Sequence, residues 1–273
     1  MKKLITLLLS LATFCTFAAE REFDVEVILF KRAVSPENVS ESWPDQLPAI
    51  DLTKAATLNN SLYLEKKGVE MLPYEDYQLT NQKQKLDKHA GFTVLMHKAW
   101  RQGDQPKGSS PVFHIRAGRD FSKSFNSDGS VKIEQPVVAD DITQETSIDQ
   151  PIYELEGKFQ VYVQHYLFLE SDLDLRSPGK REIMIESSQP VATEDAMAVE
   201  TDFNNEPLFI EESSTVEIGR MEAIKPVVKV EEFLRSYRLS QKRRMRSGEI
   251  HYLDHPLMGI IIQVRKAPVP PAS

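Results

Sequence analysis

KFQVYVQHYLFL, residues 158–169, is the stretch of the chain that decides the fold. Apolar and polar side chains alternate along it, so that Phe159 and Leu169 share one face of a strand and Lys158 and Phe168 share the other. Such alternation is typical of a β-strand, because successive side chains point to opposite faces. The continuation of this strand places three carboxylates together on the second face: Glu170, Asp172 and Asp174.

Similar patterns recur on both sides of this strand. Alternating or continuous apolar runs predict further strands, the first of them half-buried, at residues 23–29, 92–97, 112–116, 237–246, 250–255 and 259–264. Residues 77–88 have the spacing of a helix, and residues 35–58 are predicted to be irregular because they contain three prolines. The sequence therefore predicts an α+β fold, an antiparallel β-sheet with one or two helices.

The N-terminus has the pattern of a signal peptide. Lys2 and Lys3 precede an apolar stretch at residues 4–17, and Thr16-Phe17-Ala18 forms a small-x-small cleavage site. We expect residues 1–18 to be removed on export to the periplasm, although an uncleaved anchor is the alternative. The single cysteine, Cys15, lies in this peptide, so the mature chain would have no disulfide, and no later stretch is apolar enough for a membrane span.

Charge is distributed unevenly along the chain. Residues 135–223 contain 20 acids and 5 bases, whereas residues 225–266 contain 10 bases and 4 acids, within an overall charge of −8. This acidic average argues against nucleic-acid binding. Residues 187–215, rich in acids and polar side chains, are predicted to be an acidic mobile insertion within a single domain at 19–266. The prolines after it predict a frayed tail at 267–273.

The C-terminal unit, residues 238–263, is the densest in groups that bind other molecules. Alternation along its first strand gathers four cations on one face: Arg238, Lys242, Arg244 and Arg246. One interpretation is that these cations contact a ligand or a partner, since guanidinium groups hold carboxylates in a bidentate fashion. The other is that they form cross-strand pairs with the acidic ladder at 170–174. The sequence leaves both open.

A second motif follows in the same unit. Ser247-Gly248 predicts a tight turn, and His251, Asp254, His255 and Pro256 come directly after it. On a strand the two histidines stand roughly 13 Å apart, which is too far for one metal ion. We therefore interpret the motif as structural, with His251 and Asp254 forming hydrogen bonds at the corner, and expect no metal and no cofactor.

Four stretches carry a resemblance to a known family: EFDVEVILFKR (22–32), FTVLMHKAWRQ (92–102), GKFQVYVQHYLFL (157–169) and RRMRSGEIHYLDHPLMGIIIQV (243–264). Together they resemble the CsiV family of periplasmic peptidoglycan-binding proteins. The resemblance implies an accessory factor for cell-wall synthesis that associates with a bifunctional penicillin-binding synthase and its outer-membrane lipoprotein activator. It implies no catalytic residues.

The residues alone favour binding over catalysis. The chain has no GxSxG, P-loop or Rossmann glycine motif, and its mature part has no nucleophilic cysteine. We expect a non-catalytic peptidoglycan-binding protein that regulates a wall synthase. An enzyme acting on wall glycan or stem peptide is the alternative, and an envelope assembly factor without glycan contact is a third interpretation. Four aromatic residues are candidates for stacking on sugars or for packing in the core: Trp43, Trp100, Tyr162 and Tyr166.

Overall fold

The structure, a computed structural model, describes residues 21–44, 46–133, 150–185 and 227–268. The predicted signal peptide, the predicted acidic insertion and most of the predicted tail lie outside these residues. The chain divides into two compact units, one of residues 1–179 and 233–273 and the other of residues 180–232.

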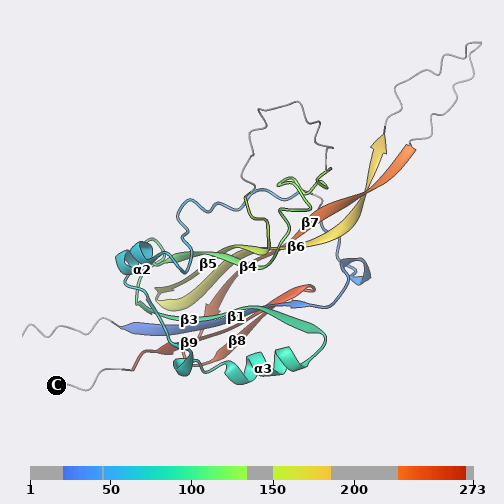
Figure 1. The fold of residues 1–273 in the computed structure, drawn as a ribbon. Coiled ribbons are helices and arrows are strands. Elements are labelled where there is room, and N and C mark those ends of the chain that lie inside the picture. Colours follow the sequence, from blue (N-terminus) through green and yellow to red (C-terminus); the bar gives the residue numbers. More distant parts are fainter. Residues whose placement is uncertain (1–20, 45, 134–149, 186–226, 269–273) are drawn as a thin grey trace, which may run out of the picture. The chain divides into compact units, whose positions relative to one another are not determined.

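Two antiparallel sheets form the first unit (Figure 1). Sheet A has the strand order β2–β3–β1–β9–β8, and sheet B has the order β4–β5–β6–β7. The strands are β1 (Glu22–Arg32), β2 (Glu70–Met71), β3 (Phe92–Gly103), β4 (Val112–Asp120), β5 (Tyr153–Gln164), β6 (Tyr166–Ile185), β7 (Val227–Met245), β8 (Ile250–Asp254) and β9 (Met258–Lys266). The second unit holds the ends of β6 and β7 that lie within its range, where Arg181 forms an ion pair with Glu231. The predicted antiparallel architecture is confirmed, with its strands divided between two sheets.

The described residues contain two short α-helices, α2 (Ser61–Lys67) and α3 (Thr80–Lys88), and two 3₁₀ turns, η1 (Pro36–Asn38) and η2 (Tyr74–Asp76). Helix α3 lies within the helix predicted at 77–88. Helix α2 was not predicted, although its ends carry recognisable signals: the Asn60 side chain accepts a hydrogen bond from the Tyr63 amide, and Gly68 takes a left-handed conformation after the last turn.

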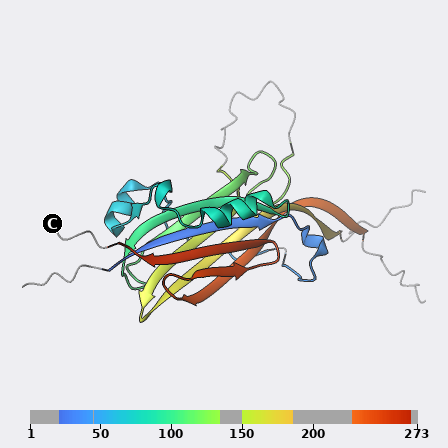
Figure 2. The same ribbon diagram turned by 90° about the horizontal axis from the view of Figure 1, so that it is seen from below.

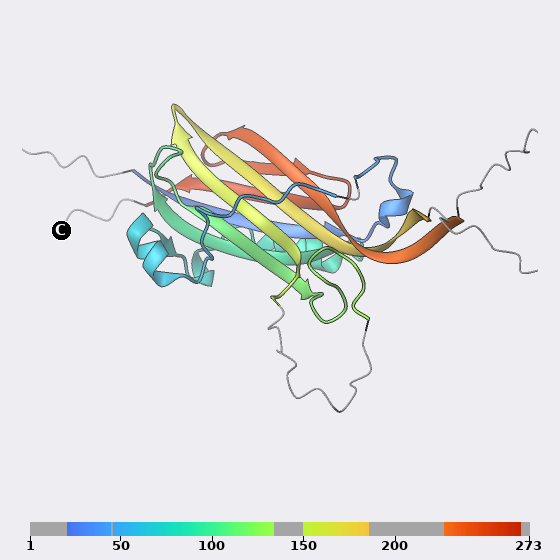
Figure 3. The ribbon, with the colours of Figure 1, turned by 90° about the horizontal axis from the view of Figure 1, so that it is seen from above.

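One apolar core fills the space between the two sheets. Strand β1 contributes Val25 and Val27 from sheet A, and sheet B contributes Phe113, Phe159 and Leu169, all of which are buried. Figure 3 shows the strands of sheet B lying over those of sheet A, and Figure 2 shows the same two layers from the opposite side, with α3 lying across sheet A. Because the core occupies the inner faces, each sheet keeps a second face that must be covered or solvated.

Strand β1 is buried on both faces, so the prediction of a half-buried strand at 23–29 was wrong. Its second face packs Ile28 and Phe30 against Leu79 and Leu86 of the α3 region. A helix therefore covers the outer face of sheet A, and the sequence alternation alone cannot reveal a helix that arrives from elsewhere in the chain.

The segment predicted as one strand at 158–169 is two strands that meet at His165. His165 takes a positive φ of 61°, and β5 pairs with β6 directly on either side of it, from Gln164 with Tyr166 onward. The turn lacks the glycine or asparagine that usually marks such a conformation, so no local pattern predicts it. The predicted assignment of residues to the two faces is nevertheless correct. Each residue of β5 pairs with a residue of β6 that lies an even number of positions further along the chain, so paired residues share a face.

Glu26 links β1 to the start of α3. Its side chain is fully buried, and its carboxylate accepts hydrogen bonds from the Gln78 amide (2.7 Å), the Leu79 amide (2.8 Å) and Arg265 Nη1 (2.8 Å), and lies 2.9 Å from His97 Nε2. Burial by itself would raise the pKa of Glu26. The hydrogen bonds from His97, Gln78, Arg265 and Leu79 outweigh burial and hold this pKa below its usual value.

We predict that Glu26→Gln lowers the free energy of unfolding by about 3–5 kcal/mol, because it leaves buried donors without their anion. Glu75→Gln, which changes an exposed acid in the adjacent 3₁₀ turn, should have little effect. Urea unfolding of the two variants measures the difference, and equal stabilities would contradict the role given to Glu26.

The same site predicts a pH dependence. Because the Glu26 carboxyl is more acidic in the folded chain than in the unfolded chain, its contribution to stability is complete above the unfolded pKa and is lost as pH falls through the folded value. Urea unfolding at a series of pH values below about 4.5 should show a shallower loss of stability for Glu26→Gln than for the wild type.

Candidate functional site

The outer face of sheet B, the face turned away from the core, carries most of the candidate residues. Alternation along each strand places polar groups there and apolar groups inside. The residues that we call the outer face are His114 and Arg116 of β4; Glu156, Lys158, Gln160 and Tyr162 of β5; Glu170, Asp172, Asp174 and Arg176 of β6; and Arg238, Ser240, Lys242 and Arg244 of β7.

The acidic and basic ladders lie side by side on β6 and β7. Arg238 holds Asp174 with two hydrogen bonds of 2.8 Å from Nε and Nη2, and Lys242 Nζ lies 3.3 Å from Glu170. Asp172 pairs instead with Lys158, at 3.3 Å, and with the Ser240 hydroxyl. Cross-strand pairing therefore accounts for Arg238 and for part of Lys242.

Arg244 and Arg246 do not pair with the acidic ladder. The Arg244 guanidinium lies over the Tyr166 ring, 4.3 Å from its centroid. Arg246 lies beyond the end of β7 with 77% of its side chain exposed, and its nearest carboxylate is Glu249, at 3.6 Å. Of the two alternatives left open, cross-strand pairing therefore does not account for these two arginines, because Lys158 and Arg238 occupy Asp172 and Asp174.

A group of rings and cations lies at the end of the outer face where β5 turns into β6. Tyr162 and Phe168 stack with their centroids 5.5 Å apart, and Tyr166 is 55% exposed. We call this group the aromatic end: Tyr162, Tyr166, Phe168, Lys107, Lys242 and Arg244. Each ring has a cation near its face: Lys107 lies 5.8 Å from the centroid of Tyr162, and Lys242 lies 5.4 Å from that of Phe168.

The two tryptophans belong to the core and its margin. Trp100 is fully buried, meets Phe113 edge to face at 4.9 Å, and donates a hydrogen bond to Gln102. Trp43 is partly buried and meets Tyr237 at 5.0 Å. Of the four aromatic residues considered for sugar stacking or core packing, Tyr166 is the one with an exposed ring; Tyr162 is 1% exposed beneath its neighbours.

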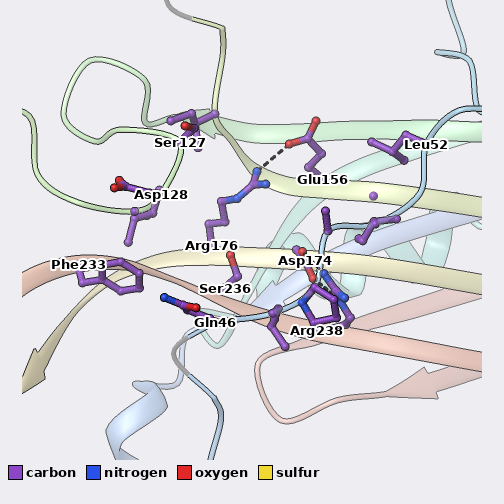
Figure 4. A pocket seen from close by; sticks show the side chains of 18 residues that line it. Gln46, Leu52, Ser127, Asp128, Glu156, Asp174, Arg176, Phe233, Ser236 and Arg238 are labelled. Atoms are coloured by element: carbon purple, nitrogen blue, oxygen red, sulfur yellow. Dashed lines mark hydrogen bonds and ion pairs between the residues drawn. The ribbon is translucent and has the colours of Figure 1, made fainter.

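A cavity of about 480 Å³ opens on the outer face at the other end from the aromatic group (Figure 4). Segment 46–52 and the turn at Ser127–Gly129 form its walls, and the ion pairs Glu156–Arg176 and Asp174–Arg238 form its floor. Burial by itself would raise the pKa of Glu156. The hydrogen bonds from Arg176 and His114 and their positive charges hold it below its usual value.

The residues of the C-terminal motif make hydrogen bonds within their own unit, and Asp254 also pairs with Arg32 of β1. His251 Nε2 lies 3.1 Å from the amide nitrogen of Arg246, His255 Nδ1 accepts a hydrogen bond from the Leu257 amide, and Asp254 accepts one from the Tyr252 hydroxyl. Gly248 has a φ of 88° in a turn that connects β7 of sheet B to β8 of sheet A, so the unit is not a simple hairpin. No three potential metal ligands come together within the described residues.

Sequence reasoning missed three parts of this face. Arg176 follows Asp174 at the next alternate position of β6, so the alternation that identified the acidic ladder could have found it. Lys107 and segment 46–52 come from irregular regions whose position depends on tertiary packing, and no local signal places them on sheet B.

With this geometry established, the comparisons with known proteins assign a family. A model of the CsiV family, described as a peptidoglycan-binding protein, matches residues 2–267. The chain belongs to the CsiV family of peptidoglycan-binding proteins. No match was found among curated proteins or among solved structures. No helix of the described residues is long and apolar enough to cross a membrane.

We predict that Arg238→Ala destabilises the fold and that Arg246→Ala does not. Removal of Arg238 leaves Asp174, whose side chain is 10% exposed, without its partner, at a cost of about 2–3 kcal/mol. The Arg246→Ala variant loses only the exposed contact with Glu249. Thermal and urea unfolding of both variants provide the test, and equal effects would show that the Arg238 pair does not stabilise the sheet.

Proposed function

We propose that the chain is a non-catalytic accessory protein of the periplasm that holds peptidoglycan on the outer face of sheet B. Peptidoglycan binding is the property of its family and implies a place in the cell envelope. The observation that supports this surface is the aromatic end, where the exposed Tyr166 ring carries the Arg244 guanidinium at 4.3 Å.

The chemistry of the aromatic end matches that of the polymer. Glycan strands present apolar C–H faces of sugar rings, which pack on exposed aromatic rings, and stem peptides present carboxylates, which attract guanidinium and ammonium groups. Lys242 and Arg246 extend this cationic edge with side chains that are 57% and 77% exposed. Arg238 is a weaker candidate for direct contact, because Asp174 occupies its guanidinium fork.

The carboxylates of the outer face favour binding over hydrolysis. A glycoside hydrolase needs one carboxyl group with a raised pKa to protonate the leaving group. Burial alone would raise the pKa of both Glu156 and Glu170. Hydrogen bonds from Arg176 and His114 nevertheless hold the pKa of Glu156 below its usual value. Hydrogen bonds from Lys107, Tyr162 and Lys242 do the same for the pKa of Glu170. Both groups are thus held as paired anions, which suits a fixed surface and not a general acid.

Regulation of a wall synthase completes the proposal. The family resemblance implies a bifunctional penicillin-binding synthase and its outer-membrane lipoprotein activator as partners. A protein that holds peptidoglycan beside that synthase would couple its activity to the presence of glycan. This part of the proposal rests on the resemblance and not on a surface of the chain.

We predict that changing Tyr166 and Arg244 together to alanine weakens binding to isolated sacculi at least about tenfold, because both a stacking ring and a charge-assisted contact are lost. The matched control is Tyr74→Ala with Lys88→Ala, which removes an exposed ring and an exposed cation near α3. Co-sedimentation measures binding, and a thermal melt of each preparation confirms folding. Equal binding by both double variants would contradict the proposed surface.

The same preparation of sacculi tests the proposal that the protein is non-catalytic. After incubation with the wild-type protein, we expect no new muropeptides and no new reducing ends in the soluble fraction. Release of either, abolished by heating the protein, would favour a wall-acting enzyme.

A further inference from the structure

The cavity on the outer face is separate from the aromatic end. None of the six residues of the aromatic end lines it. Its volume of about 480 Å³ lies in the range of small-ligand sites, roughly 300–1,000 Å³. The cavity is therefore a candidate binding site distinct from the aromatic end.

Arg176 presents an unused hydrogen-bonding edge in this cavity. Nη1 makes both of its hydrogen bonds, to the Glu156 carboxylate and to the Tyr153 carbonyl, each of 2.9 Å. Within the described part of the chain, Nε and Nη2 donate to no group. Figure 4 shows the guanidinium between the Ser127–Asp128 turn and Glu156, with the rest of the cavity beside it.

Elsewhere in this chain, the edge formed by Nε and Nη2 of an arginine binds carboxylates. Arg238 binds Asp174 through Nε and Nη2, and Arg101 binds Asp24 through the same two atoms. Such a side-on, two-bonded arrangement matches the spacing of carboxylate oxygens. The unused edge of Arg176 has the geometry of those two sites, without the carboxylate.

An apolar wall lines part of the same cavity. Leu47, Ile50 and Leu52 contribute it from segment 46–52, and Ile152 contributes from the residues before β5. A carboxylate next to small aliphatic groups would satisfy both the free edge of Arg176 and this wall. Stem peptides have that composition, because they carry alanyl methyl groups together with the carboxylates of their acidic and C-terminal residues.

We propose that this cavity is a subsite for a stem peptide of peptidoglycan, in which Arg176 holds a carboxylate through Nε and Nη2 and the wall of segment 46–52 packs on an alanyl methyl group. This inference rests on the proposed function and deepens it. The aromatic end then contacts glycan, and the cavity contacts peptide, on one face of one sheet.

The test is titration of the mature protein with the free stem tetrapeptide L-Ala-γ-D-Glu-meso-diaminopimelyl-D-Ala, followed by NMR or calorimetry. Arg176→Gln should weaken binding about tenfold to a hundredfold, as expected for the loss of a charge-assisted contact. Arg116→Gln is the matched control, because Arg116 also approaches Glu156, at 3.6 Å, but lies outside the cavity. It should change binding less than about twofold.

A second variant keeps the test valid if Arg176→Gln does not fold. Ser236→Phe places a large side chain in the cavity from β7, leaves both floor ion pairs in place, and should also weaken tetrapeptide binding. A tetrapeptide with amidated carboxylates should bind the wild type weakly, as Arg176→Gln binds the native peptide.

Sacculus co-sedimentation of the same preparations separates this inference from the proposed function. The subsite is overturned, and the proposed function stands, if the wild-type protein sediments with sacculi but does not bind the tetrapeptide. The same conclusion follows if it binds the tetrapeptide no better than Arg176→Gln and Ser236→Phe do. A wild type that does not sediment with sacculi overturns both.

Discussion

The buried carboxylate of Glu26 is the interaction on which the arrangement of faces depends. Two sheets that share one core leave two outer faces, each of which is either covered by another element or lined with polar side chains. Glu26 accepts hydrogen bonds from the amides of Gln78 and Leu79, directly before α3, and thereby fixes the helix over Ile28 and Phe30 of sheet A. Part of that face is thus covered by apolar packing, whereas the outer face of sheet B carries charges, rings and an open cavity.

Ion pairs join neighbouring strands across the middle of the outer face of sheet B. Its central carboxylates each pair with a cation on a neighbouring strand or loop, as Asp174 does with Arg238 and Glu170 with Lys107. Paired charges in a half-buried ladder fix side-chain positions and leave little net charge in the middle of the face. Groups with unused capacity then remain at its two ends: Arg244 above Tyr166, and the open edge of Arg176. A polymer made of sugars and short peptides offers complementary groups to both ends.

Much of this architecture could be predicted from local patterns, and the remainder could not for definite reasons. Alternation along 158–169 assigned the correct faces but missed the turn at His165, because a histidine in a left-handed conformation has no sequence signature. Glu26 is an ordinary polar position of an alternating strand, and its partners Gln78 and Arg265 lie 52 and 239 positions away. Alternation also identified the basic ladder on β7. It could not show that Arg238 pairs with Asp174 whereas Arg244 stacks on Tyr166, because these contacts depend on the relative register of β6 and β7.

Hydrogen–deuterium exchange of the mature protein, with and without soluble peptidoglycan fragments, tests most directly the claim that the outer face of sheet B binds the polymer. The account predicts slower exchange in the β5–β6 turn region and in residues 236–246 of β7 and the turn after it, with no change in α3. Protection confined to α3 and the outer face of sheet A would contradict it.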